Sequence, residues 1–110
     1  MAYRVELTRN AEADLEELYV WVTERAPTQG DAWFNGLEQA ILALDRLPRQ
    51  GRLAPESFDP DLPVRVINYG RRPHVYRVFF TIDEDAEVVH ILHIRRGARG
   101  RPAPDDLKGN

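Results

Sequence analysis

Hydrophobic and polar residues alternate near the start of the chain, in the segment AYRVEL. Tyr3, Val5 and Leu7 fall on one side of this segment, and Arg4 and Glu6 fall on the other. A period of two residues is typical of a β-strand that buries one face. We therefore expect a half-buried strand in this segment.

The hydrophobic period then changes to three and four residues, which indicates two amphipathic helices. Asn10 is the expected N-cap of the first helix, whose first turns are rich in acidic residues. Asp31 is the expected N-cap of the second helix, which should end at Pro48. The linker APTQGD is so short that the two helices must pack antiparallel as a hairpin.

A loop rich in proline and charge, residues 49–63, precedes three strand-like runs at hairpin spacing. These runs are VRVINYG, VYRVFFTI and EVVHILHI, and the turns GRRPH and DEDA separate them. The predicted order is β-α-α-β-β-β, an α+β fold in which a helical hairpin covers one face of an antiparallel sheet. The 110 residues suit a single domain over residues 1–110, with a frayed polar tail over about residues 100–110.

Composition excludes several kinds of site. The chain has no cysteine, so disulfides and thiolate metal sites are excluded, and a reducing cytoplasm is the expected location. His90 and His93 are three residues apart on a strand and point to opposite faces, so we expect no metal and no cofactor. No apolar run approaches the roughly 18 residues of a membrane helix, so no membrane partner is expected.

Charge is distributed unevenly between the two halves of the chain. Residues 1–62 contain six arginines and twelve acidic residues, whereas residues 63–110 contain nine basic and six acidic residues. An acidic half joined to a basic half indicates that the basic half has its own electrostatic partner.

Side-chain alternation assigns the strand residues to the two faces of the sheet. Four apolar residues of the run VYRVFFTI are expected to face the helices: Tyr76, Val78, Phe80 and Ile82. In the last run, the set expected on the opposite, open face is Val89, Ile91, His93 and Arg95. Arg65, Arg77 and Phe79 are expected on the same open face.

The open face would then carry several guanidinium groups around an aromatic ring. This arrangement suits a polyanion, because arginines bind phosphates and the ring of Phe79 stacks on a base. The candidate residues for binding a target or a nucleic acid are Arg65, Arg71, Arg72, Arg77, Phe79, Arg95, Arg96 and Arg99. The alternative is that these arginines pair with the acidic turn DEDAE or stay solvated at the sheet edge. His93 is either a general acid or base or a hydrogen-bonded structural histidine.

The predicted element order and the segment YRVFFTIDEDAEVVHILHIRRGAR, Tyr76 to Arg99, together resemble the RelE/ParE superfamily of toxins. These toxins belong to bacterial type II toxin–antitoxin modules. Members show an arginine that opens the third strand, a hydrophobic run, an acidic turn and a last strand that ends in a basic motif near a glycine. Here these elements are Arg77, VFFTI, DEDA and HIRRGAR.

The resemblance implies a small cytoplasmic toxin that a cognate antitoxin neutralises, as in plasmid-stabilisation modules. Exposed aromatic side chains would give an antitoxin helix a docking surface, and Trp21 and Trp33 are the candidates. Trp33 lies on an apolar helix stripe and fits the core equally well. The oligomeric state is left open.

Two activities are known in the superfamily, and the sequence favours the ParE-like one. ParE-like members inhibit DNA gyrase, and the GAR motif after the last strand looks more like that side. The alternative is a RelE-like mRNA interferase, a metal-independent endoribonuclease that cleaves ribosome-bound mRNA. Its catalytic residues here would be Arg77, Arg95 and His93, with Arg65 at a nuclease lysine position. However, the segment GRPAPDDLKGN lacks the C-terminal tyrosine or histidine–tyrosine pair of many nucleases.

A third hypothesis is a member that binds its antitoxin but has lost toxicity. Under the toxin hypotheses, Arg77→Ala is expected to reduce toxicity. It is also expected to cost little stability, because the guanidinium of Arg77 should be solvated.

Overall fold

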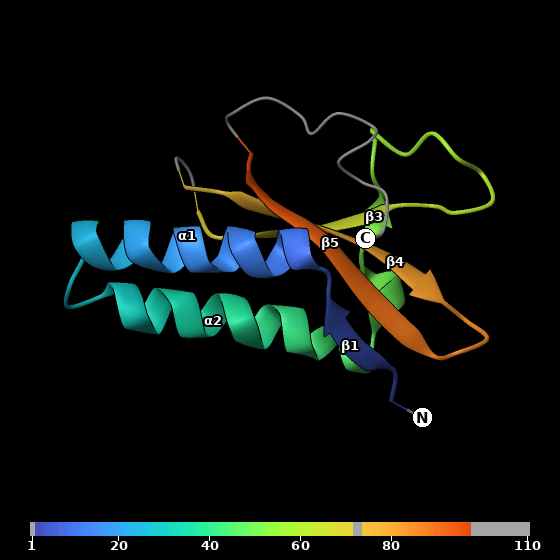
Figure 1. The fold of residues 1–110 in the computed structure, drawn as a ribbon, viewed down its shortest axis with the longest axis horizontal. Coiled ribbons are helices and arrows are strands. Elements are labelled where there is room, and N and C mark those ends of the chain that lie inside the picture. Colours follow the sequence, from blue (N-terminus) through green and yellow to red (C-terminus); the bar gives the residue numbers. More distant parts are fainter. Residues whose placement is uncertain (1, 72–73, 98–110) are drawn as a thin grey trace.

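The computed structural model describes residues 2–71 and 74–97. Arg72, Arg99 and the tail from residue 100 therefore lie outside the described residues. Figure 1 shows two helices side by side along one face of a sheet. The elements in order are β1 (Arg4–Leu7), α1 (Arg9–Arg25), α2 (Gly30–Leu42), the short 3₁₀ helices Ala43–Asp45 and Pro48–Gln50, β2 (Arg52–Leu53), β3 (Arg65–Tyr69), β4 (Tyr76–Asp83) and β5 (Val88–Arg96).

Both helices begin earlier than the sequence predicted. Thr8, not Asn10, is the N-cap of α1, because the Ala11 amide donates to Thr8 Oγ1 at 3.3 Å. The helix α2 begins at Gly30 after the N-cap Gln29, so Asp31 lies in its first turn rather than at its cap. An acidic residue in the first turn still stabilises the helix through its dipole.

The sheet has the strand order β1-β5-β4-β3-β2. The predicted antiparallel meander of β3, β4 and β5 is confirmed. The predicted first strand joins it at β5, but the pairing is parallel, so the complete sheet is mixed. The two-residue β2 lies inside the predicted loop and pairs antiparallel with β3.

A β-bulge interrupts the pairing of β4 with β5. Phe79 is opposite His93, whereas the next residue, Phe80, is opposite Ile91. Leu92 is therefore the extra residue of β5. A bulge shifts the alternation of the strand by one position, so the faces assigned to β5 from strict alternation are only half right.

The bulge explains which residues of β5 reach the core. Before it, Val89 and Ile91 face the helices, which corrects the prediction that they lie on the open face. After it, His93 and Arg95 lie on the face opposite the helices, as predicted, because they are the partners of Phe79 and Arg77. The assignment of Tyr76, Val78, Phe80 and Ile82 to the helix side is confirmed.

The face opposite the helices is not open. The loop of residues 54–64, which we call the strap, covers part of it, and the Ala54 amide closes its base by donating to the Val64 carbonyl at 2.8 Å. The strap contributes to a second hydrophobic cluster under it, which consists of Ala54, Val64, Val66, Phe79 and Leu92. Hence the sheet is buried on both sides in this region.

Candidate functional site

The strap supplies a carboxylate to the arginine that opens β4. Arg77 Nη1 lies 2.7 Å from Glu56 Oε2, and Nη2 lies 2.9 Å from Oε1. The side chains of Arg77 and Glu56 are only 15% and 6% exposed. The guanidinium also lies 4.7 Å from the ring centroid of Phe79. The prediction of a solvated guanidinium at Arg77 is therefore wrong.

Two further residues predicted for the open cationic face are not exposed there: Phe79 lies on that face but is covered, and Arg65 lies on the helix side. Phe79 is fully buried beneath the strap, so its ring is not available to stack on a base. Arg65 is opposite Phe80, on the helix side of the sheet, and its Nη1 donates to the Gly51 carbonyl at 2.8 Å. The predicted grouping of Arg65, Arg77 and Arg95 on one open face is therefore wrong.

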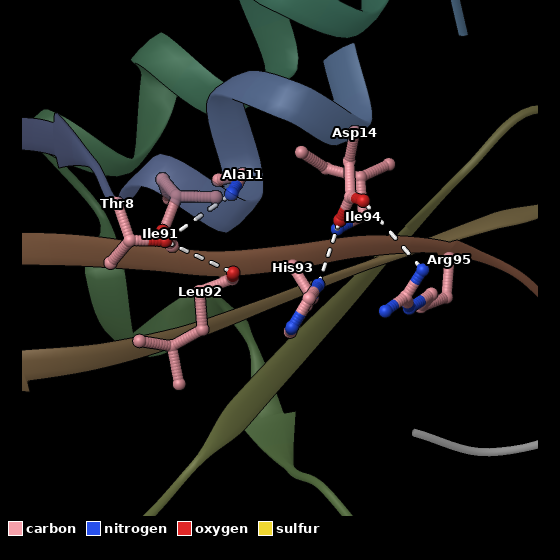
Figure 2. A network of polar contacts seen from close by, with 8 residues as sticks. All are labelled: Thr8, Ala11, Asp14, Ile91, Leu92, His93, Ile94 and Arg95. Atoms are coloured by element: carbon pink, nitrogen blue, oxygen red, sulfur yellow. Dashed lines mark hydrogen bonds and ion pairs between the residues drawn. The ribbon is translucent and has the colours of Figure 1, made fainter. Parts of the chain in front are cut away.

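A second polar cluster lies where β1 ends and leaves the edge of β5 unpaired (Figure 2). The Ile94 amide donates to Asp14 Oδ2 at 2.9 Å, and His93 Nδ1 lies 2.8 Å from the same oxygen. Arg95 Nη1 lies 3.6 Å from Asp14 Oδ1. A side chain of α1 thus satisfies the free strand edge and pairs with two cationic candidates of β5.

Thr8 makes a matching connection at the N-cap of α1, six residues before Asp14 (Figure 2). Its Oγ1 lies 2.9 Å from the Ile91 carbonyl and 3.1 Å from the Leu92 carbonyl, and its amide donates to the Ile91 carbonyl at 3.0 Å. These contacts fix the bulge at Leu92 to the start of α1. Thr8 and Asp14 together hold α1 along β5.

His93 has a structural role in this arrangement, and only one of its two ring nitrogens is hydrogen-bonded to a described residue. It is 4% exposed, and its Nδ1–H donates to the acceptor Asp14. His93 Nε2 is buried and has no hydrogen-bond partner among the residues that the structure describes. A general acid or base must reach its substrate, and the burial of His93 does not allow this in the present conformation.

The remaining cationic candidates gather at the far end of β5, beside α1. Arg96 lies opposite Tyr76 on the helix side, and its guanidinium carbon is 5.8 Å from the ring centroid of Trp21. Arg25 lies over the same ring at 4.3 Å. Arg71 is exposed at the turn after β3. The Arg95 side chain is 39% exposed.

Trp21 and Trp33 line a common hollow between the helical hairpin and the β3–β4 turn. The other residues that line it are Val22, Arg25, Ala26, Gln29, Gly30, His74 and Tyr76. Trp33 is half-buried and contacts the rings of Tyr69 and Tyr76, with centroid distances of 5.2 and 5.4 Å. The lining is mostly apolar and is bordered by cationic side chains.

Three residues of these clusters were not identified from the sequence: Thr8, Asp14 and Glu56. Threonine is a preferred N-cap residue, so the sequence did indicate Thr8, but Asn10 is an equally good N-cap candidate two residues later. Asp14 is one of four acidic residues between Glu12 and Glu17, and no sequence pattern distinguishes it from the other three. Glu56 lies in an irregular loop, where side-chain direction has no period.

A comparison with protein-family models shows to which family this chain belongs. The family model described as "ParE toxin of type II toxin-antitoxin system, parDE" matches residues 5–100. The chain belongs to the ParE toxin family. The resemblance to the RelE/ParE superfamily is thus confirmed, and the protein is a toxin of the type II class.

Solved structures share the fold of this ParE-family toxin. A chain of the chromosomal ParDE TA system from P. aeruginosa has a TM-score of 0.66 and 23% identity, with coverage of 86% of this chain and 96% of that chain. A free-state arginine mutant of E. coli toxin RelE has a TM-score of 0.57 and 16% identity, with coverage of 87% and 84%. The archaeal RelE–RelB complex from Pyrococcus horikoshii has a TM-score of 0.60 and 19% identity, with coverage of 91% and 100%.

No curated protein matches this ParE-family toxin in sequence. Within residues 2–71 and 74–97, no group of three or more potential ligands is arranged to hold a metal ion. In the same ranges, neither helix is long and apolar enough to cross a membrane.

Proposed function

We propose that this ParE-family toxin arrests bacterial growth in the cytoplasm by inhibiting DNA gyrase. Family membership supports the proposal, and so does the closed second face of the sheet. A nuclease of this superfamily needs cationic side chains that reach a phosphate, whereas Arg77 is bound to Glu56 and His93 is buried. The closed Arg77–Glu56 pair is the observation that carries the choice of gyrase over mRNA.

The gyrase-binding residues are proposed among the cations that remain accessible: Arg71, Arg95 and Arg96. Arg72 and Arg99 belong to the same proposal, although they lie outside the described residues. Arg95 is the sharpest candidate, because its side chain is 39% exposed and Asp14 contacts it at 3.6 Å rather than through a short bond. An arginine in this state can exchange a weak partner for a stronger one.

The first test is induction of the protein in a bacterial host, with an assay of supercoiling by purified gyrase. Growth arrest, a DNA-damage response and inhibition of supercoiling are expected. The charge reversal Arg95→Glu should reduce the inhibition by about tenfold or more, and Arg49→Glu, an exposed position away from this end, should not. Normal supercoiling activity in the presence of excess toxin contradicts the gyrase proposal.

The alternative function is an mRNA interferase, and one observation favours it. Arg77 and Arg95 are direct neighbours across β4 and β5, with His93 beside them on the same face. Growth arrest with cuts in ribosome-bound mRNA and unaffected gyrase supports this alternative. The absence of growth arrest supports a member that binds an antitoxin without being toxic.

We also propose that a cognate antitoxin docks in the hollow at Trp21 and Trp33. An extended or helical antitoxin segment would insert apolar side chains between these rings, and its carboxylates would pair with Arg25 and Arg96. Large aromatic side chains with arginines beside them are typical anchors of a protein interface. The antitoxin segment is therefore expected to be apolar and acidic.

Trp21→Ala is expected to weaken antitoxin binding by about 2 kcal/mol, which is roughly a thirtyfold rise in Kd. Isothermal titration calorimetry with the antitoxin encoded beside the toxin measures this change. Phe58→Ala is the matched control, because Phe58 is 55% exposed but lies on the strap, away from the hollow. Equal affinities of wild type and Trp21→Ala would place the antitoxin elsewhere.

A further inference from the structure

Trp33 is packed against a tyrosine that does not itself line the hollow. The indole of Trp33 makes edge-to-face contacts with Tyr69 and Tyr76, with centroid distances of 5.2 and 5.4 Å and an interplanar angle of 69° in each pair. Tyr76 lines the hollow, whereas Tyr69, the last residue of β3, is not among the described residues that line it. Tyr69 therefore reaches the hollow through Trp33.

A hydrogen bond joins the same tyrosine to the backbone of α2. The hydroxyl of Tyr69 donates to the Trp33 carbonyl at 2.8 Å, in a partly buried position. Inside an α-helix such a carbonyl also accepts from the amide four residues later, so the hydroxyl uses its second lone pair. The ring contact and the hydrogen bond thus fix the side chain and the backbone of Trp33 against the end of β3.

The close approach of Tyr69 to α2 depends on the absence of a side chain at residue 36. A Cβ atom added to Gly36 would overlap Tyr69 Oη and would lie 3.2 Å from Tyr69 Cζ. Glycine in the interior of a helix is less stable than alanine, so its presence in α2 calls for a reason. The space that Gly36 leaves is the space that the tyrosine hydroxyl occupies.

We propose that Tyr69 is a positioning residue for antitoxin binding, which fixes the orientation of Trp33 through a contact that Gly36 makes possible. This inference rests on the proposed docking of the antitoxin at Trp21 and Trp33. A side chain that is ordered before binding loses little conformational entropy when the partner arrives. A fixed indole therefore binds an apolar antitoxin side chain more tightly than a mobile indole does.

Tyr69→Phe tests the proposal in binding, because it removes the hydroxyl and keeps the ring. With the antitoxin encoded beside the toxin as the probe, its Kd should be about fivefold higher than that of wild type. Tyr19→Phe is the matched control, since the hydroxyl of Tyr19 also connects the two helices, at 3.3 Å from Asp31 Oδ1, but does not line the hollow. Its Kd should stay within about twofold of wild type.

Fluorine NMR of the free toxin labelled with 5-fluorotryptophan separates positioning from a loss of stability. Well below the unfolding transition, the Trp33 resonance of Tyr69→Phe should shift or broaden, whereas the Trp21 resonance should not. A purely structural role of the hydroxyl lowers the unfolding midpoint but leaves both resonances of the folded protein unchanged. Unchanged resonances would therefore overturn the positioning role.

Gly36→Ala tests the requirement for glycine. Alanine normally stabilises the interior of a helix relative to glycine, but here its methyl group should displace the Tyr69 hydroxyl and lower the unfolding midpoint by about 5 °C. In the Tyr69→Phe background the same substitution should not lower the midpoint, because the overlapping oxygen is gone. If Gly36→Ala alone does not fold, folding of the double variant gives the same support. An equal loss in both backgrounds overturns the role of Gly36.

Trp33→Ala distinguishes failure of this inference from failure of the docking proposal. If Trp33→Ala weakens antitoxin binding and Tyr69→Phe does not, the docking site stands and the positioning role of Tyr69 is wrong. If Trp33→Ala binds the antitoxin as tightly as wild type, the docking site itself is wrong, and this inference fails with it.

Discussion

Replacing Arg77 by alanine is expected to lower the free energy of unfolding by about 3–5 kcal/mol. Glu56 is 6% exposed, and both of its carboxylate oxygens would lose their bonds to the guanidinium. Phe79 would also lose the group that lies 4.7 Å from its ring centroid. Urea denaturation followed by far-UV circular dichroism measures the loss. This expectation reverses the one drawn from the sequence, in which Arg77 was solvated.

The matched control for Arg77→Ala is Arg49→Ala. Arg49 and Glu84 also form an ion pair at 2.7 Å, but their side chains are 62% and 49% exposed, so its loss should cost less than about 1 kcal/mol. The double variant Glu56→Leu/Arg77→Met should recover most of the stability, because apolar residues of similar volume replace a buried pair at little cost. A loss in Arg77→Ala no larger than in Arg49→Ala would contradict the buried pair.

Replacing Asp14 by alanine is expected to cost about 2–3 kcal/mol of stability. The Ile94 amide and His93 Nδ1–H would lose their acceptor at a part of β5 where β1 no longer pairs. Arg95 contributes little to this loss, because its contact with Asp14 is long and its side chain is partly exposed. Chemical denaturation again provides the measurement.

Glu17→Ala is the control on the same helix, because Glu17 is exposed and is expected to change stability by less than about 0.5 kcal/mol. Hydrogen exchange gives a more local readout for Asp14→Ala. The Ile94 amide should exchange faster in that variant, whereas the Phe80 amide within the β4–β5 ladder should exchange at a rate set by global stability. Unchanged protection at Ile94 would show that Asp14 does not cap the strand edge.

The element order was predictable because each element carries a strong local pattern. The alternation at the first strand, the apolar stripes of the helical hairpin and the short turns of the meander all depend on neighbours in sequence. The parallel pairing of β1 with β5 has no such signal, since it joins opposite ends of the described chain. Local periodicity identifies a strand but not the strand beside it.

The faces of the sheet were less predictable, and Leu92 shows why. One extra residue in β5 moves Val89 and Ile91 to the helix side while His93 and Arg95 stay opposite. Nothing in the run VVHILHIRR distinguishes a bulged strand from a regular one. The bulge depends on partners elsewhere, above all on Thr8, which binds the Leu92 carbonyl.

The sequence predicted which residue types form the candidate site, but not that its arginines are paired with carboxylates. Arg77 and Arg95 are neighbours on one face as expected, yet each has a carboxylate from outside the sheet. Local sequence patterns contain no information on Glu56, which reaches Arg77 across 21 positions of sequence. Whether an arginine is free depends on such tertiary partners rather than on its own strand.

The pairing of β1 with β5 has a consequence for synthesis of the toxin. The partners of Arg4–Leu7, which are Val88–Ile91, are translated more than eighty positions after them. Until then both helices lack most of the apolar sheet surface against which they pack, since β4 and β5 supply much of the main hydrophobic cluster. Contacts between distant positions form late in folding. A nascent chain therefore completes the edge of this sheet only after Val88–Ile91 have been translated.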